Sequence, residues 1–300
     1  MSLTKTGMIK NASTARSKFH YISRAQQFKT YQEHDLETIE FMHSGNMPTC
    51  DSPDLFWQAA DLNERRNGRV CSSFVVALPK ELTVEQRIEL AEQFIDEFAM
   101  RYRFPFSCAI HNHAGAFSGQ EQPHLHFMYS ERHVDGHERD LAQFFKRYNT
   151  KEPEKGGAKK LTADKLGLRK GQITFFRQKA EKLINHALKT YAPTKKVEIK
   201  GVSLEVPNVV SCLSNKDYKE KYGIELQDVP IMSKRIRFAK KAKDEALFAQ
   251  QQEILAEIQR IRKENEYKLY KAYYDAELRR IWQLEQAKKE KDKRYDGPGF

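Results

Sequence analysis

Two short apolar runs, FSCAIH at residues 106–111 and HLHFMY at residues 124–129, decide the fold of this 300-residue chain. Aliphatic and aromatic side chains dominate both runs, and the loop between them contains two glycines and a proline. Such runs separated by turn residues predict two strands that are neighbours in the sequence. We therefore expect an antiparallel pair within a sheet.

Three histidines of this pair meet on one face. Side chains two positions apart in a strand point the same way, so His124 and His126 share a face, and antiparallel pairing brings His111 beside them. Neutral imidazole suits a divalent transition ion, and three ligands leave positions open for a substrate oxygen. His113 is an alternative third ligand, and a polar sheet face without an ion is the other interpretation.

The flanking sequence extends this pair into a mixed fold. A β-branched run at 71–78 predicts a further strand, and a helix follows at 83–101, where Thr83 and Gln86 can form a capping box. Helices are also predicted at 141–148 and 170–191, separated by a basic, glycine-bearing loop at 149–162. The pattern predicts the α+β class, an antiparallel sheet with helices packed on it.

The composition changes near residue 230. From residue 233 to 295 there are 18 Lys and Arg against 11 Asp and Glu, and turn residues are absent until residue 296. This predicts a long basic helical extension, so we expect two domains, 1–228 and 229–300. Leu247, Ile254 and Ile261 recur every seven residues, but the apolar pattern later shifts phase. A dimeric coiled coil, a helical hairpin and a single packed helix all remain open.

Charge and composition narrow the class of partner. The formal net charge is +11 and the pI about 9.3, which favours a polyanionic partner such as nucleic acid. No apolar run is long enough to span a bilayer, and residues 1–10 do not read as a signal peptide, so we expect a cytoplasmic protein without membrane insertion. The four cysteines are far apart and are expected to be buried thiols.

Tyr21 is a candidate nucleophile for phosphodiester chemistry. It lies in a helix-compatible segment, 15–24, with cations before and after it. An ordinary phenol has a pKa near 10, so a nearby metal ion or cation would help to form the attacking phenolate. An amphipathic packing role is the common alternative for a tyrosine.

A series of ordered motifs resembles a known family. The motifs are AR at 15–16 leading to YI at 21–22, HSGNMP at 43–48, WQAADL at 57–62, ER at 64–65, NGR at 67–69, ALPKEL at 77–82, PHLH at 123–126, SER at 130–132, FFKRYN at 144–149 and KGGA at 155–158. Together they resemble the MobA/MobL relaxases of mobilisable plasmids, which are metal-dependent endonucleases of the HUH class.

The resemblance implies a role for each site residue. Tyr21 would cleave one strand at the nic site within oriT, forming a 5′-phosphotyrosyl link and freeing a 3′-OH. His111, His124 and His126 would hold Mn²⁺ or Mg²⁺ against the scissile phosphate, and His111 is favoured over His113.

The implied substrate is single-stranded DNA at oriT, held in a basic groove. The candidate contacts are cations near the motifs: Arg24, Arg132, Arg139, Lys146, Arg147, Lys155, Lys159 and Lys160. The helical extension could bind duplex oriT, relaxosome accessory proteins or a type IV secretion coupling protein, or could serve as a solvated spacer.

Two departures from the family pattern keep alternatives open. Relatives commonly carry a glutamate in the strand before the ALP motif, where this chain has Ser72 to Val76; water, His20 or Glu131 could substitute. The short polar stretch 1–6 is a poor first strand. A non-cleaving homologue that binds oriT, for example as a repressor, is the alternative function, for which restoring a carboxylate by Ser73→Glu should raise nicking. Rolling-circle replication initiation by the same chemistry is a third.

Overall fold

The computed structural model describes residues 14–29, 37–48, 51–114, 120–199, 201–237 and 244–295. The chain divides into two compact units, one formed by residues 1–193 and 208–212 and the other by residues 194–207 and 213–300. The boundary expected at residue 228 stays a prediction. The doubt about a first strand at residues 1–6 falls outside the described residues.

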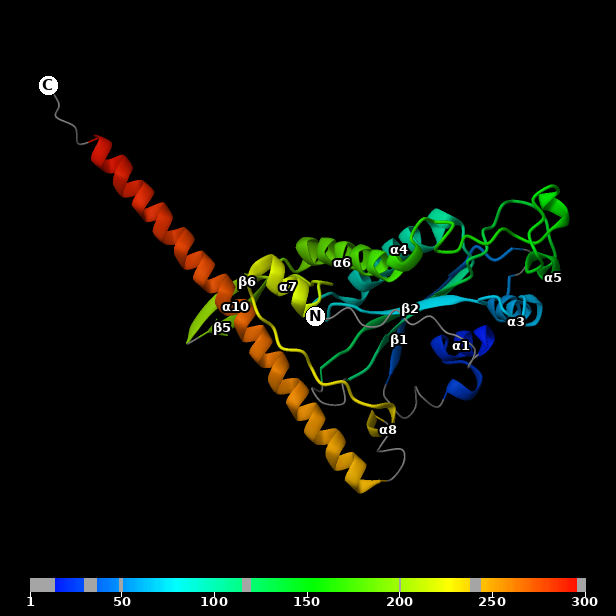
Figure 1. Cartoon of the computed structure of the whole chain (residues 1–300), viewed down its shortest axis with the longest axis horizontal. Helices are drawn as coiled ribbons and strands as arrows, with labels where there is room; N and C mark the ends of the chain where they lie inside the picture. Colours follow the sequence, from blue (N-terminus) through cyan, green and yellow to red (C-terminus); the bar gives the residue numbers. More distant parts are fainter. Residues whose placement is uncertain are drawn as a thin grey trace. The chain divides into compact units, whose positions relative to one another are not determined.

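The first unit is built on a four-stranded antiparallel sheet (Figure 1). Its strands are β1 (Thr38–Gly45), β2 (Ser72–Ala77), β3 (Phe106–Asn112) and β4 (His124–Tyr129), in the order β1-β3-β4-β2. The predicted β3–β4 pair lies at the centre, with His111 opposite His124 and Ala109 opposite His126. The α+β class and the central hairpin are thereby confirmed.

Helices cover both faces of the sheet (Figure 1). Leu125 and Phe127 point into an apolar core with α4 (Val84–Phe98) and α6 (Gln172–Tyr191). On the other face, Met128 packs with α1 (Ala15–Ile22) and α3 (Pro53–Asn63). Because side chains alternate along β4, His124 and His126 lie on this second face, under α1.

Most predicted boundaries hold. The Thr83–Gln86 capping box begins α4 as expected. The helix predicted at 141–148 is wrong beyond its first turn, because α5 (Leu141–Phe144) stops where the next carbonyls bond to a buried arginine. Short 3₁₀ turns complete the unit at Gln26–Phe28, Met100–Tyr102, Pro153–Lys155 and Arg169–Gly171.

The second unit contains a hairpin and the predicted long helix. Strands β5 (Thr194–Ile199) and β6 (Val202–Pro207) pair antiparallel, and the helices are α7 (Asn215–Tyr222), α8 (Lys234–Arg237) and α10 (Glu245–Tyr295). On α10, Ile261 is buried, whereas Leu278 and Ile281 are exposed. No helix in the described part of the chain has the length and apolar composition needed to cross a bilayer. Cys71 and Cys108 are buried free thiols, and Cys50 lies outside the described residues.

Candidate metal centre and nucleophile

The structure brings the three predicted histidines together. Each of His111, His124 and His126 offers a ring nitrogen, and these nitrogens all lie within 4.8 Å of one another. The ring centroid of His126 lies 4.6 Å from that of His111 and 4.8 Å from that of His124. This spacing allows all three imidazoles to bind one cation.

Backbone carbonyls fix which nitrogens are free to bind. His111 donates from Nε2 to the Ile22 carbonyl at 2.6 Å, which leaves its Nδ1 as the ligand atom. His124 donates from Nδ1 to the Gln122 carbonyl at 2.9 Å, which leaves Nε2. Such outer bonds orient ligating histidines and increase their basicity.

Two of the free nitrogens are buried without a hydrogen bond. Among the described residues, His111 Nδ1 and His126 Nε2 are in this state, which is costly unless a ligand satisfies them. Burial lowers the pKa of His124 and takes that of His126 well below its usual value, so both are neutral and can ligate. The donor set therefore fits a divalent transition ion.

Glu37 is a site residue that the sequence pattern did not reveal. Its Oε1 lies 3.5 Å from His111 Nδ1, and its Oε2 accepts a hydrogen bond from Arg24 Nε at 2.6 Å. Burial acts to raise the pKa of Glu37, but His111 and Arg24 outweigh it and bring the pKa to about 2. Glu37 directly precedes β1, a strand that was not predicted. The local sequence around Glu37 therefore did not indicate that it lies near His111.

Tyr21 lies against the histidine cluster. Its ring makes an edge contact with His126, with centroids 5.5 Å apart, and the Arg24 guanidinium carbon lies 4.3 Å from the Tyr21 ring centroid. Arg24 is buried, and it donates to the Tyr21 carbonyl and to Glu37. The Arg24 guanidinium is therefore enclosed within the site, and its contact with the DNA backbone stays a prediction.

Helix α3 holds α1, and hence Tyr21, in position. Asp61 accepts hydrogen bonds from the backbone N–H groups of Ala15 and Arg16 at 2.7 and 2.9 Å. A carboxylate at this position satisfies the N-terminal donors of α1 and complements its dipole. Asp54 binds His20 Nε2 at 2.5 Å. This contact engages His20, which was one of the candidates to substitute for the family glutamate.

His113 belongs to a different group from the three predicted ligands. Its ligand nitrogen clusters with Glu37 and His124 rather than with His111 and His126. Its ring centroid lies 5.4 Å from that of His124. His113 is thus beside the centre, in the position of an alternative ligand.

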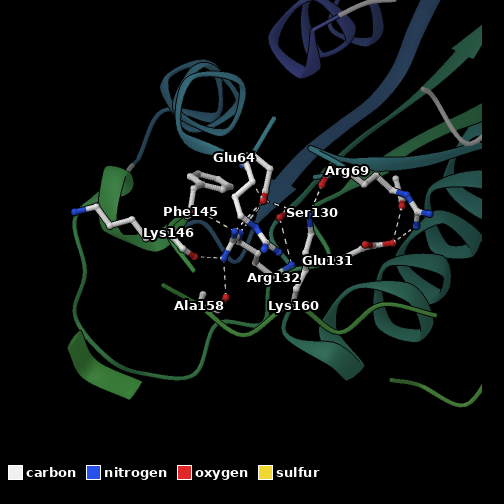
Figure 2. Close-up of polar contacts among 11 residues, drawn as sticks. Glu64, Arg69, Ser130, Glu131, Arg132, Phe145, Lys146, Ala158 and Lys160 are labelled. Carbon is white, nitrogen blue, oxygen red and sulfur yellow. Dashed lines mark hydrogen bonds and ion pairs between the residues drawn. The ribbon is translucent and has the colours of Figure 1, made fainter. Parts of the chain in front are cut away.

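Arg132 lies at the centre of a buried network of polar contacts (Figure 2). It is 2% exposed and pairs with Glu64 through Nε and Nη2 at 2.9 and 3.0 Å. Its remaining three donors bond to the carbonyls of Phe145, Lys146 and Ala158. All five N–H groups are used, so none is left for a phosphate.

The same network accounts for other family motifs. Glu131 is buried against Arg69 and Ser72, so it cannot supply the missing carboxylate to Tyr21. Lys160 lies 3.2 Å from Glu64 and is partly buried. A Cβ on Gly157 would lie 2.0 Å from the Lys146 carbonyl oxygen, so only glycine fits there.

The other predicted DNA contacts differ in how far their side chains are exposed. Arg139 is 3% exposed and bonds to Asp135 and to the carbonyls of Pro153 and Gly156, so its DNA contact stays a prediction. Four of the predicted contacts are exposed on the loop after α5, namely Lys146, Arg147, Lys155 and Lys159. In Figure 2 the Lys146 side chain extends away from the buried cluster.

Comparison with known proteins agrees with the motifs. The model of the MobA/MobL family matches residues 7–205. Mobilization protein A of Escherichia coli is 44% identical over 160 residues, which are 53% of this chain and 21% of that protein. The 43 kDa relaxation protein of Salmonella typhimurium is 47% identical over 137 residues, 45% of this chain and 36% of that protein. The aligned part thus spans about a fifth and about a third of these two relatives.

Proposed function

Because the chain belongs to the MobA/MobL family, we propose that it is a plasmid mobilisation relaxase that nicks one DNA strand at oriT through Tyr21. The observation that carries this proposal is the edge contact between the Tyr21 ring and His126, one of three imidazoles whose spacing allows them to bind one cation. A phenol and a cation site at this separation can act on the same phosphate.

Each site residue has a distinct part in this reaction. A divalent cation held by His111, His124 and His126, Mn²⁺ or Mg²⁺, would supply Lewis-acid stabilisation of the scissile phosphate. The Tyr21 oxygen attacks phosphorus and forms a 5′-phosphotyrosyl bond, while the 3′ oxygen leaves and takes up a proton. Because the covalent link conserves the phosphodiester energy, the ends can later be rejoined.

Glu37 acts as an orienting residue in this proposal. Its Oε2 is engaged by the Arg24 guanidinium, so the carboxylate is not free to accept the phenolic proton. Its carboxylate instead lies beside His111 Nδ1 and pairs with Arg24, and so places a negative charge next to the cation site. The phenolic proton is then released to water.

The nicking test uses the full-length chain with Mn²⁺ and overlapping single-stranded oligonucleotides from candidate oriT sequences. The expected product is an SDS-stable adduct with one oligonucleotide, and Tyr21→Phe should abolish it. Tyr222→Phe, an exposed tyrosine of the other unit, is the matched control and should retain it. An adduct that survives Tyr21→Phe would remove Tyr21 from its role.

The same test decides the alternative, a homologue that binds oriT without cutting. This alternative is motivated by Ser73 and Val75, which lie on the strand where relatives carry glutamate, with Val75 directly opposite His126. Salt-sensitive DNA binding with no adduct under any metal would support it. Cleavage that maps to a replication origin instead of oriT would indicate rolling-circle initiation.

We place the DNA path along the exposed loop cations, Lys146, Arg147, Lys155 and Lys159. Neutralising one of them to glutamine should weaken binding for every sequence and reduce the salt slope by about 0.7 for each phosphate that is no longer neutralised. The basic helix α10 is proposed to bind relaxosome accessory proteins or a secretion coupling protein. A loss of mobilisation with unchanged nicking, on substitution of its exposed residues, would support that role.

A further inference from the structure

Lys18 lies on the same face of the sheet as the three histidines, and the proposed chemistry gives it no role. It lies on α1 one turn before Tyr21, and residues three apart on a helix are neighbours on its surface. Its Nζ donates a short hydrogen bond to the Ser73 hydroxyl on β2. The ammonium group is therefore fixed over the sheet beside the helix face that carries Tyr21.

The strand register places Lys18 relative to the metal centre. Ser73 pairs with Met128, and Val75, two residues along the same face, pairs with His126. Two strand residues span about 7 Å. A phosphate held at the three histidines is thus too far for direct contact with Lys18, whereas the next phosphate of the same strand is within its reach.

The hydrogen-bond partner of Lys18 is a neutral hydroxyl. Within the described residues Lys18 makes no ion pair, and Ser73, its hydroxyl partner, is buried. Burial lowers the pKa of Lys18, which is the response of an ammonium group short of solvent and of anions. A half-buried cation in this state is stabilised when an anion arrives.

We propose that Lys18 binds the backbone phosphate that neighbours the scissile phosphate, and so sets the register of the DNA strand over Tyr21. This inference rests on the proposed function, because it presumes a DNA strand in the site. The proposal also gives a reason for a neutral side chain at position 73. A carboxylate at position 73 would pair with Lys18 and take the place of the phosphate.

The test measures binding rather than cleavage. A thymidine oligonucleotide is titrated against the full-length chain in the Tyr21→Phe background over a range of salt concentrations. Lys18→Met should weaken binding about tenfold and reduce the slope of log K against log salt by about 0.7. Lys18→Arg should retain the slope. Lys189→Met, which removes an exposed cation at the end of α6, is the matched control and should leave both quantities unchanged.

A purely structural role would give another pattern. If Lys18 only anchors α1 to β2, then Lys18→Met and Ser73→Ala should lower the thermal midpoint alike and leave the salt slope unchanged, which would overturn the proposal. Should Lys18→Met fail to fold, Ser73→Glu gives the same answer. If Ser73→Glu reduces the salt slope of DNA binding, the phosphate contact is supported. If the salt slope is unchanged and Ser73→Glu forms more adduct in the chain that retains Tyr21, the proposal is overturned. Absence of any adduct in the unmodified chain would remove the nicking proposal alone.

Discussion

At the scale of single residues, the contact between Glu37 and His111 makes a specific prediction. Glu37→Gln removes the charge that faces His111 Nδ1 and holds Arg24. We expect Mn²⁺ affinity, measured by isothermal titration, to fall about 10- to 100-fold, as for other outer-shell changes. Adduct formation should fall in parallel because the cation site is then less occupied.

The matched control for this change is Glu40→Gln. Glu40 is a carboxylate of the neighbouring strand β1, but it pairs with Arg87 rather than with a histidine. This control should lower the free energy of unfolding while leaving Mn²⁺ affinity intact. Equal loss of Mn²⁺ affinity in both variants would show that Glu37 acts only through general stability.

Single residues also show which features can be predicted from the sequence and which cannot. The histidines could be predicted because strand alternation is local, and His124 and His126 are two residues apart. The burial of Arg132 and Arg139 was not predicted, because proximity to a motif says nothing about burial. Arg132 bonds to Glu64, 68 residues away, and only the folded chain brings that pair together. Glu37 reaches His111 across a similar separation.

At the scale of elements, the pair formed by Glu64 and Arg132 links the end of α3 to the segment after β4, and Arg132 also bonds to carbonyls of the loop after α5. The pKa of Glu64 is lowered, since Arg132 and Lys160 outweigh the burial that would raise it. Its stabilisation is therefore full above the unfolded pKa, about 4.3, and is lost as pH falls through the lower folded value. Glu64→Gln should cost roughly 3–5 kcal/mol of unfolding free energy at pH 7.

Urea unfolding across pH checks this prediction. The difference between the unmodified chain and Glu64→Gln should shrink as the pH falls below about 4. Glu92→Gln, an exposed carboxyl on α4, should stay within about 0.5 kcal/mol of the unmodified chain. A Glu64→Gln difference that is independent of pH would contradict the assigned ion pair.

Element boundaries were predictable where the cause is local. The capping box at Thr83 and the apolar runs of β3 and β4 contain their own signals, and those elements were found. The strand β1 was not found, since its half-exposed face breaks the simple alternation. The early end of α5 was missed because its cause is the distant guanidinium of Arg132.

At the scale of the whole molecule, the candidate site lies in one unit and much of the net positive charge lies in the other. The three histidines, Tyr21 and Glu37 all belong to the first unit. Within the second, Lys195 of β5 lies 5.0 Å from the Tyr270 ring of α10 and 3.8 Å from Glu266. Truncation after Asp228 thus leaves the candidate site whole but removes the helix partner of the hairpin.

The truncated chain should keep its Mn²⁺ affinity and its adduct-forming activity. Its DNA affinity should depend less steeply on salt, because the segment from 233 to 295 carries seven of the eleven excess positive charges. The amides of β5 and β6 should lose protection in hydrogen exchange, since they no longer pack on α10. Loss of Mn²⁺ binding with retained hairpin protection would show that the helical extension supports the metal centre, contrary to the two-unit division.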